Sequence, residues 1–306
     1  MLNQGAGHDV ESRAAETLAL MHRWGYTPAV DALAASLLGG SVSGEHLKAH
    51  IAGSSRVRVE DGFAYLPGHE HLLEGSRRRV ASHQTLNGAA LAVAQEFTRD
   101  LVRVCPYVEC VALSGSVASG GYGPADDVDF DLIVRSGTKY TSYLMATLVG
   151  LRYSWRYRHR EVDELHRTPL LPKVICLNVV WTDAEARPFL RQDADMAFEL
   201  MRCRPLFGTG RFREMLDENP WIRDYFPQAY EPLPSEDPPL ERGALAGFVM
   251  AIGQVRGARQ VIELASRGAV WALYHFVQWT RRRNPNAVQR NEFLRRVKAP
   301  YEVLQD

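Results

Sequence analysis

The sequence is poor in cysteine and has no excess of charge of either sign. Its 306 residues include four cysteines, and no two of them have the spacing of a CxxC motif. So few cysteines in a chain of this size exclude a disulfide framework, so we expect reduced, mostly buried thiols and a cytoplasmic protein. Lysine and arginine (36) balance aspartate and glutamate (36), so no overall field draws the chain to nucleic acid or to a membrane.

Long hydrophobic runs are also missing. The longest apolar stretch, residues 243–252, is too short to span a bilayer, and Gln254 and Arg256 follow it. Near the N-terminus Asp9 and Glu11 interrupt any apolar run, so we expect no signal peptide. The sequence therefore predicts no membrane partner, and any contact with nucleic acid must depend on a local patch.

Residues 1–80 have the pattern of a small domain. The spacing of apolar residues and caps such as Ser43 predict three helices, over 11–24, 27–38 and 44–51. Two short alternating segments joined by Asp61-Gly62 then indicate a β-hairpin. This order resembles a winged helix-turn-helix, but its third helix offers few basic groups. Sequence-specific DNA binding therefore has weak support, and a structural or protein-docking role is at least as well supported.

The rest of the chain combines strands and helices. A long helix is expected over 76–104 and a shorter one over 141–152. Three buried strands are expected over 108–114, 128–135 and 174–181. From residue 184 the pattern is helical almost to the end, with a proline-rich linker at 231–239. We predict an α/β (α+β) chain in three parts: the winged-helix-like domain (1–80), a domain with a small mixed sheet (81–185) and a C-terminal helical domain (186–306).

A glycine-rich turn follows the first buried strand of the middle domain. The strand runs directly into Gly115-Ser116, and Ser119 and Gly120 follow closely. Glycine allows the backbone to turn sharply and to approach a ligand, and the serine adds a hydroxyl group. Turns of this kind bind phosphate oxygens through their backbone amides. A P-loop lysine, a GxGxxG motif and a GxSxG nucleophile motif are all missing, so other common phosphate and hydrolase sites are excluded.

Acidic residues alternate along the next strand. Asp127 and Asp129 are two residues apart, so both carboxylates lie on one face, roughly 6 to 7 Å apart along the chain. Asp131 continues this face, whereas Val128 and Phe130 point to the other face. Carboxylates so close together on a buried strand need a counter-charge, and Mg²⁺ prefers carboxylates together with substrate phosphates. The pattern predicts a Mg²⁺ or Mn²⁺ site at Asp127 and Asp129.

Gly115-Ser116 with Asp127-x-Asp129 resembles the signature of the DNA polymerase beta superfamily of nucleotidyltransferases, close to its minimal members. The resemblance covers residues 108–134 well and 170–181 loosely. It implies transfer of a nucleoside monophosphate from a nucleoside triphosphate to a hydroxyl or phosphate, with release of pyrophosphate. The implied catalytic residues are Asp127 and Asp129. The acceptor stays open among a small molecule, a protein side chain and an RNA 3′ end.

The superfamily usually supplies a third carboxylate from a later strand, and here that strand has Asn178 as its internal polar residue. Asparagine can offer an oxygen to a metal but cannot take a proton at neutral pH. Three interpretations are open. Asp131 supplies the missing charge, or an acid of the loop at 161–164 does so. Alternatively, the chain is a catalytically silent nucleotide-binding or nucleic-acid-associated regulator.

Several cations are candidates for binding the triphosphate. Arg156 belongs to a basic and aromatic cluster at 152–160, where arginine can bind phosphate and aromatic rings can stack on a base. Lys139 and Lys173 are further candidates. With Gly115, Ser116 and Ser119 they complete the nucleotide-binding residues that the sequence suggests.

Overall fold

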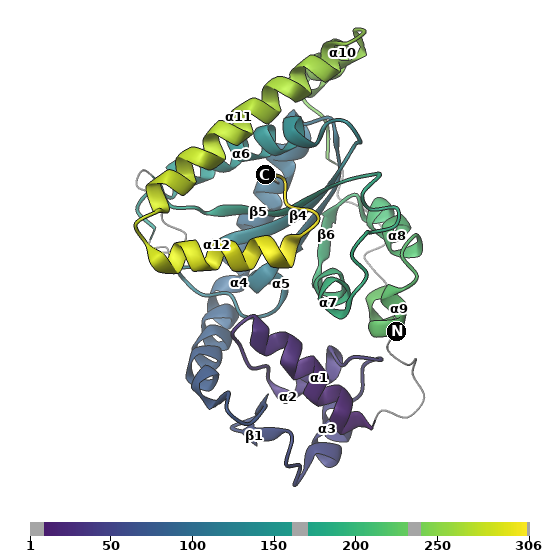
Figure 1. The fold of residues 1–306 in the computed structure, drawn as a ribbon, viewed down its shortest axis with the longest axis vertical. Helices are drawn as coiled ribbons and strands as arrows, with labels where there is room; N and C mark the ends of the chain where they lie inside the picture. The colour runs from purple at the N-terminus through teal and green to yellow at the C-terminus, as the bar shows by residue number, and fades with distance from the viewer. Residues whose placement is uncertain (1–8, 161–170, 232–239, 305–306) are drawn as a thin grey trace.

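The structure, a computed structural model, describes residues 9–160, 171–231 and 240–304 (Figure 1). The loop acids at 161–164 and most of the proline-rich linker lie outside the described residues. The helices are α1 (Val10–Arg23), α2 (Val30–Ala35), α3 (Gly44–Ile51), α4 (Leu73–Val104), α5 (Gly115–Ala118), α6 (Lys139–Arg156), α7 (Ala194–Arg202), α8 (Thr209–Asp217), α9 (Ile222–Tyr225), α10 (Ala244–Gln254), α11 (Ala258–Arg281) and α12 (Pro285–Lys298). The strands are β1 (Arg58–Glu60), β2 (Phe63–Tyr65), β3 (Val108–Ser114), β4 (Val128–Val134), β5 (Ile175–Thr182) and β6 (Arg204–Phe207).

A four-stranded mixed sheet lies at the centre, in the order β5-β4-β3-β6. β4 runs parallel to β5, and β3 is antiparallel to both β4 and β6. The crossover from β4 to β5 passes through α6, as parallel neighbours require. One face of the sheet packs in a core with α4 and α6, and the other face joins a core built from α7, α8 and the N-terminal helices. The expected mixed α/β character, with a small mixed sheet, is confirmed.

The two faces of β4 differ as the alternation predicts. Val128, Phe130 and Leu132 are fully buried in the core beneath α4 and α6. Because successive side chains of a strand point to opposite faces, Asp129 and Asp131 lie on the other face, which they share with Ile133. The apolar face of the strand therefore packs in the core, while its acidic face points away from α4 and α6.

The region after residue 184 is less helical than expected. Residues 204–207 form β6, an edge strand paired with β3, in place of a helix. Pro205 is tolerated there because an edge strand leaves some of its amides without a ladder partner. A further helix, α12, follows α11; it starts where the Asn284 side chain accepts hydrogen bonds from the amides of residues 286 and 287, with Pro285 in its first turn.

The N-terminal unit has the expected three helices and two-stranded hairpin. Helix α2 begins at Val30 and not at Thr27, because Ala29 pairs with Phe63 of the hairpin in an extended conformation. The apolar core of this unit is continuous with side chains of α7 and α9. Helix α4 starts beside the hairpin and runs on under the sheet (Figure 1). The N-terminal unit therefore packs directly on the rest of the chain.

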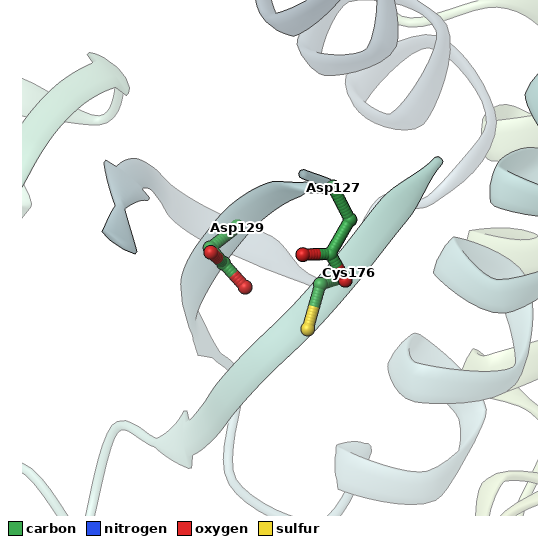
Figure 2. Close-up of side chains that lie close together, drawn as sticks. All are labelled: Asp127, Asp129 and Cys176. Atoms are coloured by element: carbon green, nitrogen blue, oxygen red, sulfur yellow. The ribbon is translucent and has the colours of Figure 1, made fainter. Parts of the chain in front are cut away.

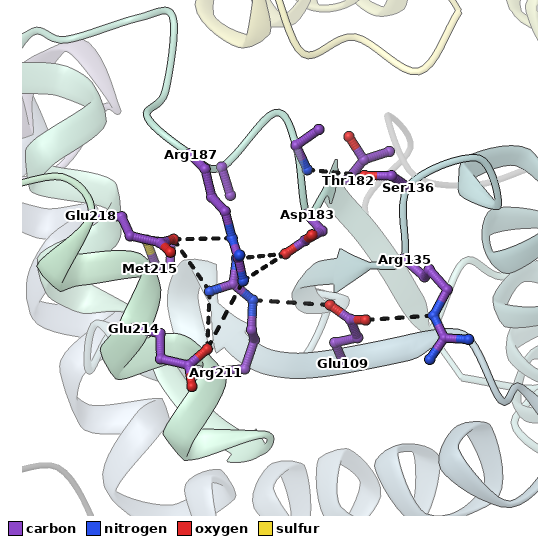
Figure 3. Close-up of polar contacts among 12 residues, drawn as sticks. Glu109, Arg135, Ser136, Thr182, Asp183, Arg187, Arg211, Glu214, Met215 and Glu218 are labelled. Atoms are coloured by element: carbon purple, nitrogen blue, oxygen red, sulfur yellow. Dashed lines mark hydrogen bonds and ion pairs between the residues drawn. The ribbon is translucent and has the colours of Figure 1, made fainter.

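An ionic network attaches α8 to the sheet (Figure 3). The Arg211 side chain, only 10% exposed, contacts Asp183 after β5 at 2.9 Å and Glu218 at 3.4 Å. Its Nε also lies 3.9 Å from Glu109 of β3. Asp183 follows the end of β5, whereas Asp129 lies near the start of β4, so this network is at the opposite end of the sheet from the aspartates.

A stacked pair of histidines sits inside the N-terminal unit. The rings of His22 and His69 are 4.1 Å apart between centroids, and His22 is 9% exposed. Neither ring nitrogen of His22 has a hydrogen-bond partner in the described chain. Burial, and then the charges of His69 and His71, lower the pKa of His22 to about 4. The histidine is therefore folded into the core in its neutral form.

We expect this histidine to make the fold sensitive to acid. Its contribution to stability is present above pH 6.5, the ordinary value, and is lost as the pH falls through 6.5 towards 4. The loss between pH 7 and pH 5 is about 1 to 2 kcal/mol, since one pKa unit corresponds to about 1.4 kcal/mol. Urea unfolding at pH 7 and pH 5 measures it, and His22→Gln should lose less stability than wild type over that interval. An equal loss in both proteins would assign the acid sensitivity to other groups.

Candidate functional site

The site lies where β3 passes into α5 and β4 begins. Gly115 has φ of +62°, a left-handed conformation that favours glycine. A β-carbon at this position would lie 2.1 Å from Oδ2 of Asp129, whose backbone is the register partner of Ser114. The backbone of Gly115 therefore lies directly against the Asp129 carboxylate. Gly115 and the two aspartates, 12 and 14 residues further along the chain, form one site.

Two carboxylates and one thiol meet at this place (Figure 2). One ligand atom from each of Asp127, Asp129 and Cys176 lies within 4.8 Å of the other two. Cys176 comes from β5, where it is the register partner of Asp129 on the parallel neighbour. On the strand expected to supply a third carboxylate, the residue facing the two aspartates is thus a cysteine. Sequence reasoning placed Asn178 there and missed Cys176.

Lys173 supplies positive charge to this cluster. Its Nζ lies 2.9 Å from Oδ2 of Asp127 and donates to Sγ of Cys176 at 2.7 Å. Burial is the largest single effect and works against the charged amine, but Asp127, Cys176 and Asp129 together outweigh it and raise the pKa of Lys173. The lysine therefore stays charged and balances part of the negative charge of the two aspartates.

The aspartates themselves are hard to ionise together. Burial, and then the charge of Asp127, raise the pKa of Asp129 to about 7, although Lys173 lowers it in part. Burial also raises the pKa of the Cys176 thiol, which stays protonated at neutral pH. A divalent cation at the two carboxylates would relieve this repulsion, since an opposite charge favours the ionised form.

A second polar group adjoins the first along β4. Asp131 is buried and accepts hydrogen bonds from Ser114 Oγ (3.2 Å), Asn178 Nδ2 (3.0 Å) and Cys203 Sγ (3.2 Å). The same Asn178 amide donates to Oε1 of Glu199 on α7 at 3.0 Å. Asn178 thus joins two carboxylates.

A register shift explains the position of Asn178. Phe130 pairs with Leu177 and Asp131 with Val179, so Asn178 is the extra residue of a bulge in β5. An unshifted register would have paired Asn178 with Asp131 and would not have placed it beside Asp127 and Asp129. From the bulge its amide donates to both Asp131 and Glu199.

Glu199 is an acidic residue that the sequence did not single out. It lies on α7 between the buried Phe198 and Leu200, and burial, followed by the charge of Asp131, raises its pKa to about 7. Burial likewise raises the pKa of Asp131 to about 6. The contact of Glu199 with Asn178 depends on the packing of α7 on the sheet, and the one local signal was an acid between two buried apolar residues, Phe198 and Leu200.

The C-terminal helices bring two cations towards these acids. The positive charge of Lys298, at the end of α12, lowers the pKa of Asp129, Asp131 and Glu199. Arg281, at the end of α11, has its own pKa lowered by burial and raised in part by Asp127. In Figure 1, α12 passes across the strands of the sheet. The acidic face of β4 is thus approached by basic residues from helices more than 150 residues away in the chain.

Ser119 ends α5 and connects the glycine turn to the N-terminal unit. Its carbonyl accepts a hydrogen bond from Arg202 of α7 at 3.1 Å, and the Arg202 guanidinium also lies over the ring of Tyr26. Ser116, at the start of the short helix, is partly exposed. Gly115, Ser116 and Ser119 therefore lie together in one turn next to Asp129.

Two basic candidates from the sequence lie elsewhere. Lys139 begins α6, beyond the far end of β4, and pairs with Glu185 at 2.8 Å. Because Asp129 is five residues before Val134, the last residue of β4, roughly 17 Å of strand separates this end from Asp129. Arg156 pairs with Glu96 of α4 at 2.7 Å. In its own cluster, Arg160 instead donates to the carbonyl of Asp126 at 2.7 Å and so supports the loop before Asp127.

Of the three residues in this cluster, the two aspartates suit a divalent metal and the cysteine does not. Asp127 and Asp129 offer hard oxygen ligands, the kind that Mg²⁺ and Mn²⁺ prefer. The protonated thiol of Cys176 is a poor ligand for either ion. Two carboxylates, completed by phosphate oxygens of a substrate, are therefore the donor set that fits.

Comparison with known proteins adds no relative from which to read the activity. The chain matches no family model, and comparisons with curated proteins and with solved structures give no significant match. None of the described helices is long and apolar enough to cross a membrane. What the chain does must therefore be argued from the site itself.

Proposed function

We propose that this chain is a metal-dependent nucleotidyltransferase. It would transfer a nucleoside monophosphate from a nucleoside triphosphate to a hydroxyl or phosphate of an acceptor and release pyrophosphate. The observation that carries the proposal is the contact of the Gly115 backbone with the Asp129 carboxylate, beside Asp127. A phosphate-binding turn placed directly against paired carboxylates suits a substrate that carries both phosphate and a bound cation.

Each part of the site has a role in this proposal. Asp127 and Asp129 would hold Mg²⁺ or Mn²⁺, which neutralises phosphate charge as pyrophosphate leaves. The Gly115-Ser116 turn and Ser119 would bind the triphosphate, since amides in the first turn of a helix lack partners within it. An acceptor oxygen forms a bond to the α-phosphorus, and the bond from that phosphorus to the leaving pyrophosphate breaks. Asp131 and Glu199, with raised pKa values, are this chain's candidates to take the acceptor's proton.

The test is direct transfer by the wild-type protein. Each common ribonucleoside triphosphate, labelled at the α-phosphate, is incubated with the protein, Mg²⁺ or Mn²⁺ and a cell extract as the source of acceptor. We expect label in an acid- or chromatography-resolved product and matching release of pyrophosphate, both stopped by EDTA. No transfer with any nucleotide, by a protein that still binds nucleotide, would reject the enzyme.

A second candidate function is nucleotide binding without turnover. It is favoured by Lys173, whose amine contacts the Asp127 carboxylate, and by the thiol of Cys176 where a third carboxylate is expected. A regulator of this kind would use the N-terminal unit as its docking part. Lys48 of α3 is 3.6 Å from Asp31, which leaves that helix few basic groups for reading DNA.

Cys176→Asp separates the two candidates. The new carboxylate would stand opposite Asp129 and beside Lys173, and we expect Mn²⁺ to bind at least about 10-fold more tightly, because a further charged oxygen joins the donor set. Mn²⁺ titration followed by electron paramagnetic resonance measures this, with Cys105→Ser, a buried thiol in the core beneath α4 and α6, as the control. Transfer that appears only in Cys176→Asp would support a silent wild type, whereas transfer in both supports the enzyme.

The architecture around the site belongs to the same proposal. Residues 1–80 would form a winged-helix-like domain, 81–185 the nucleotidyltransferase domain and 186–306 a helical domain that shapes the acceptor pocket. The acceptor, whether a small molecule, a protein side chain or RNA, would enter between α7 and the C-terminal helices, in a cytoplasmic protein.

A further inference from the structure

Helix α11 is apolar on two opposite faces. Ser266 and Val270 are buried on the side where the helix packs against α6. The opposite side carries large apolar side chains that are exposed by 48 to 70%: Val261, Leu264, Trp271, Phe276 and Trp279. A helix that is apolar on both sides is normally covered on both sides. Figure 1 shows α11 at the outer edge of the molecule, with no described element over this second face.

The exposed side chains form one continuous stripe. Positions 261, 264, 268, 271 and 275 are separated alternately by three and four residues, the spacing of a coiled-coil seam. At 100° per residue, these positions and Ala265, Ala272, Phe276 and Trp279 fall within one side of the helix. The middle of the stripe, at Ala265, Gly268 and Ala272, is made of small residues, which allow another backbone to come close.

We propose that this stripe binds the same stripe of a second copy of the chain, with the two α11 helices antiparallel about a two-fold axis at Gly268. Reversal of the helix about Gly268 places Trp271 opposite Ala265 and Leu264 opposite Ala272. Trp279 likewise faces Gly257, while Val261 faces His275 and Phe276 faces Gln260, so the three bulkiest contacts at Leu264, Trp271 and Trp279 make the surface complementary to itself. Self-complementarity is the condition for a symmetric dimer.

The size of the stripe fits a stable dimer. Five large apolar side chains, with the exposures given above, and the small residues between them offer on the order of 800 Å² per copy, the area of a standard interface. The borders of the stripe carry few charges to repel, apart from Arg282, whose guanidinium lies 4.4 Å from the centroid of the Trp279 ring at the end of α11. Gln260 and Gln278 lie on one border, and Arg267 there is turned over the ring of Tyr140. Helices that lie on membranes instead carry lysine and arginine along their borders, which favours a protein partner here.

The mass of the full chain in solution tests the proposal. We expect sedimentation equilibrium at micromolar concentration to give about twice the monomer mass of 34.4 kDa. Leu264→Glu, at an exposed position, should weaken self-association at least about 100-fold, because it brings two charges into the seam of the dimer. Val59→Glu changes an apolar residue that is 47% exposed on the hairpin, and it should leave the dimer intact.

A cross-link tests the axis independently of affinity. Gly268→Cys places a thiol where nothing lies within 4 Å, and the native cysteines are all buried. Mild oxidation should join two copies through residue 268, which stands next to its own symmetry mate. Gly247→Cys, equally open on α10, lies about 30 Å further along the helices and should not cross-link.

Three results would overturn the proposal. One is a monomeric wild type at all concentrations, including one that binds anionic vesicles through Leu264, since the stripe would then be a lipid-binding surface. Another is a dimer that persists in Leu264→Glu, which would assign self-association to a different surface. The third is a Gly247→Cys cross-link as efficient as that of Gly268→Cys.

Discussion

Asp129→Asn is expected to lower nucleotidyl transfer by at least about 1000-fold while making the metal-free protein more stable. The asparagine amide has the shape of the carboxylate but not its charge, so the metal loses one of two ionic ligands. In the absence of metal, the same change removes a carboxylate whose pKa is raised to about 7 by burial and by Asp127. Removal of that unfavourable charge should stabilise the fold by about 1 kcal/mol at pH 8.

The opposite signs of the two effects make this substitution informative. Thermal unfolding with EDTA and α-labelled transfer with Mg²⁺ are measured on the same preparation. Asp224→Asn, an exposed position on α9, controls for the loss of one negative charge and should change neither quantity. Wild-type transfer rates in Asp129→Asn would show that the aspartates do not carry the reaction. A loss of stability would show that the carboxylate is satisfied without a metal.

Gly115→Ala should damage both the fold and the candidate site. The new β-carbon would lie 2.1 Å from Oδ2 and 2.7 Å from Cγ of Asp129, so one of the two must move. The left-handed φ of +62° adds the strain of a non-glycine residue. We expect a loss of about 2 to 4 kcal/mol in the free energy of unfolding, together with loss of Mn²⁺ and nucleotide binding.

Gly120→Ala is the matched control. This glycine lies in the same turn and has φ of +81°, but nothing lies within 4 Å of an added β-carbon. Gly120→Ala should lower the free energy of unfolding by about 1 kcal/mol, through backbone strain alone, and should leave metal binding close to wild type. Urea unfolding and Mn²⁺ titration of both variants separate strain from collision. Equal effects in the two variants would mean that Gly115 does not hold the Asp129 carboxylate in place.

The sequence predicted the glycine turn and the paired aspartates because each of these features depends on residues that are close together in the chain. The buried strand before Gly115, the glycine turn and the alternation at Asp127 and Asp129 each depend on neighbouring residues. Their meeting in space follows from the antiparallel pairing of consecutive strands, here Ser114 with Asp129. Sequence reasoning handles such short-range geometry well, since turn chemistry and strand alternation are properties of a few residues.

The other residues of the site are brought there by contacts between distant segments, which the spacing of residues within one helix or strand does not predict. Cys176, and not Asn178, lies beside Asp127 and Asp129, because the parallel register pairs Asp129 with Cys176, and the alternation of one strand does not fix which residues of its neighbour lie opposite. Glu199 reached the site through the packing of α7 on the sheet. Strand β6 was expected to be helical, since Arg204–Phe207 is too short to show a period and gains its structure from pairing with β3.

The continuous helix α4 has a practical consequence for protein engineering. It begins at Leu73, where Ser76 accepts a hydrogen bond from the Thr27 amide at 2.8 Å, and it continues to Val104 beneath the sheet. A cut at residue 80 would remove about its first two turns and expose apolar side chains that pack on α7 and α9. The N-terminal unit can therefore not be exchanged as an independent domain by a cut at residue 80. A domain swap at this boundary needs a junction that keeps the whole helix with its partners on both sides.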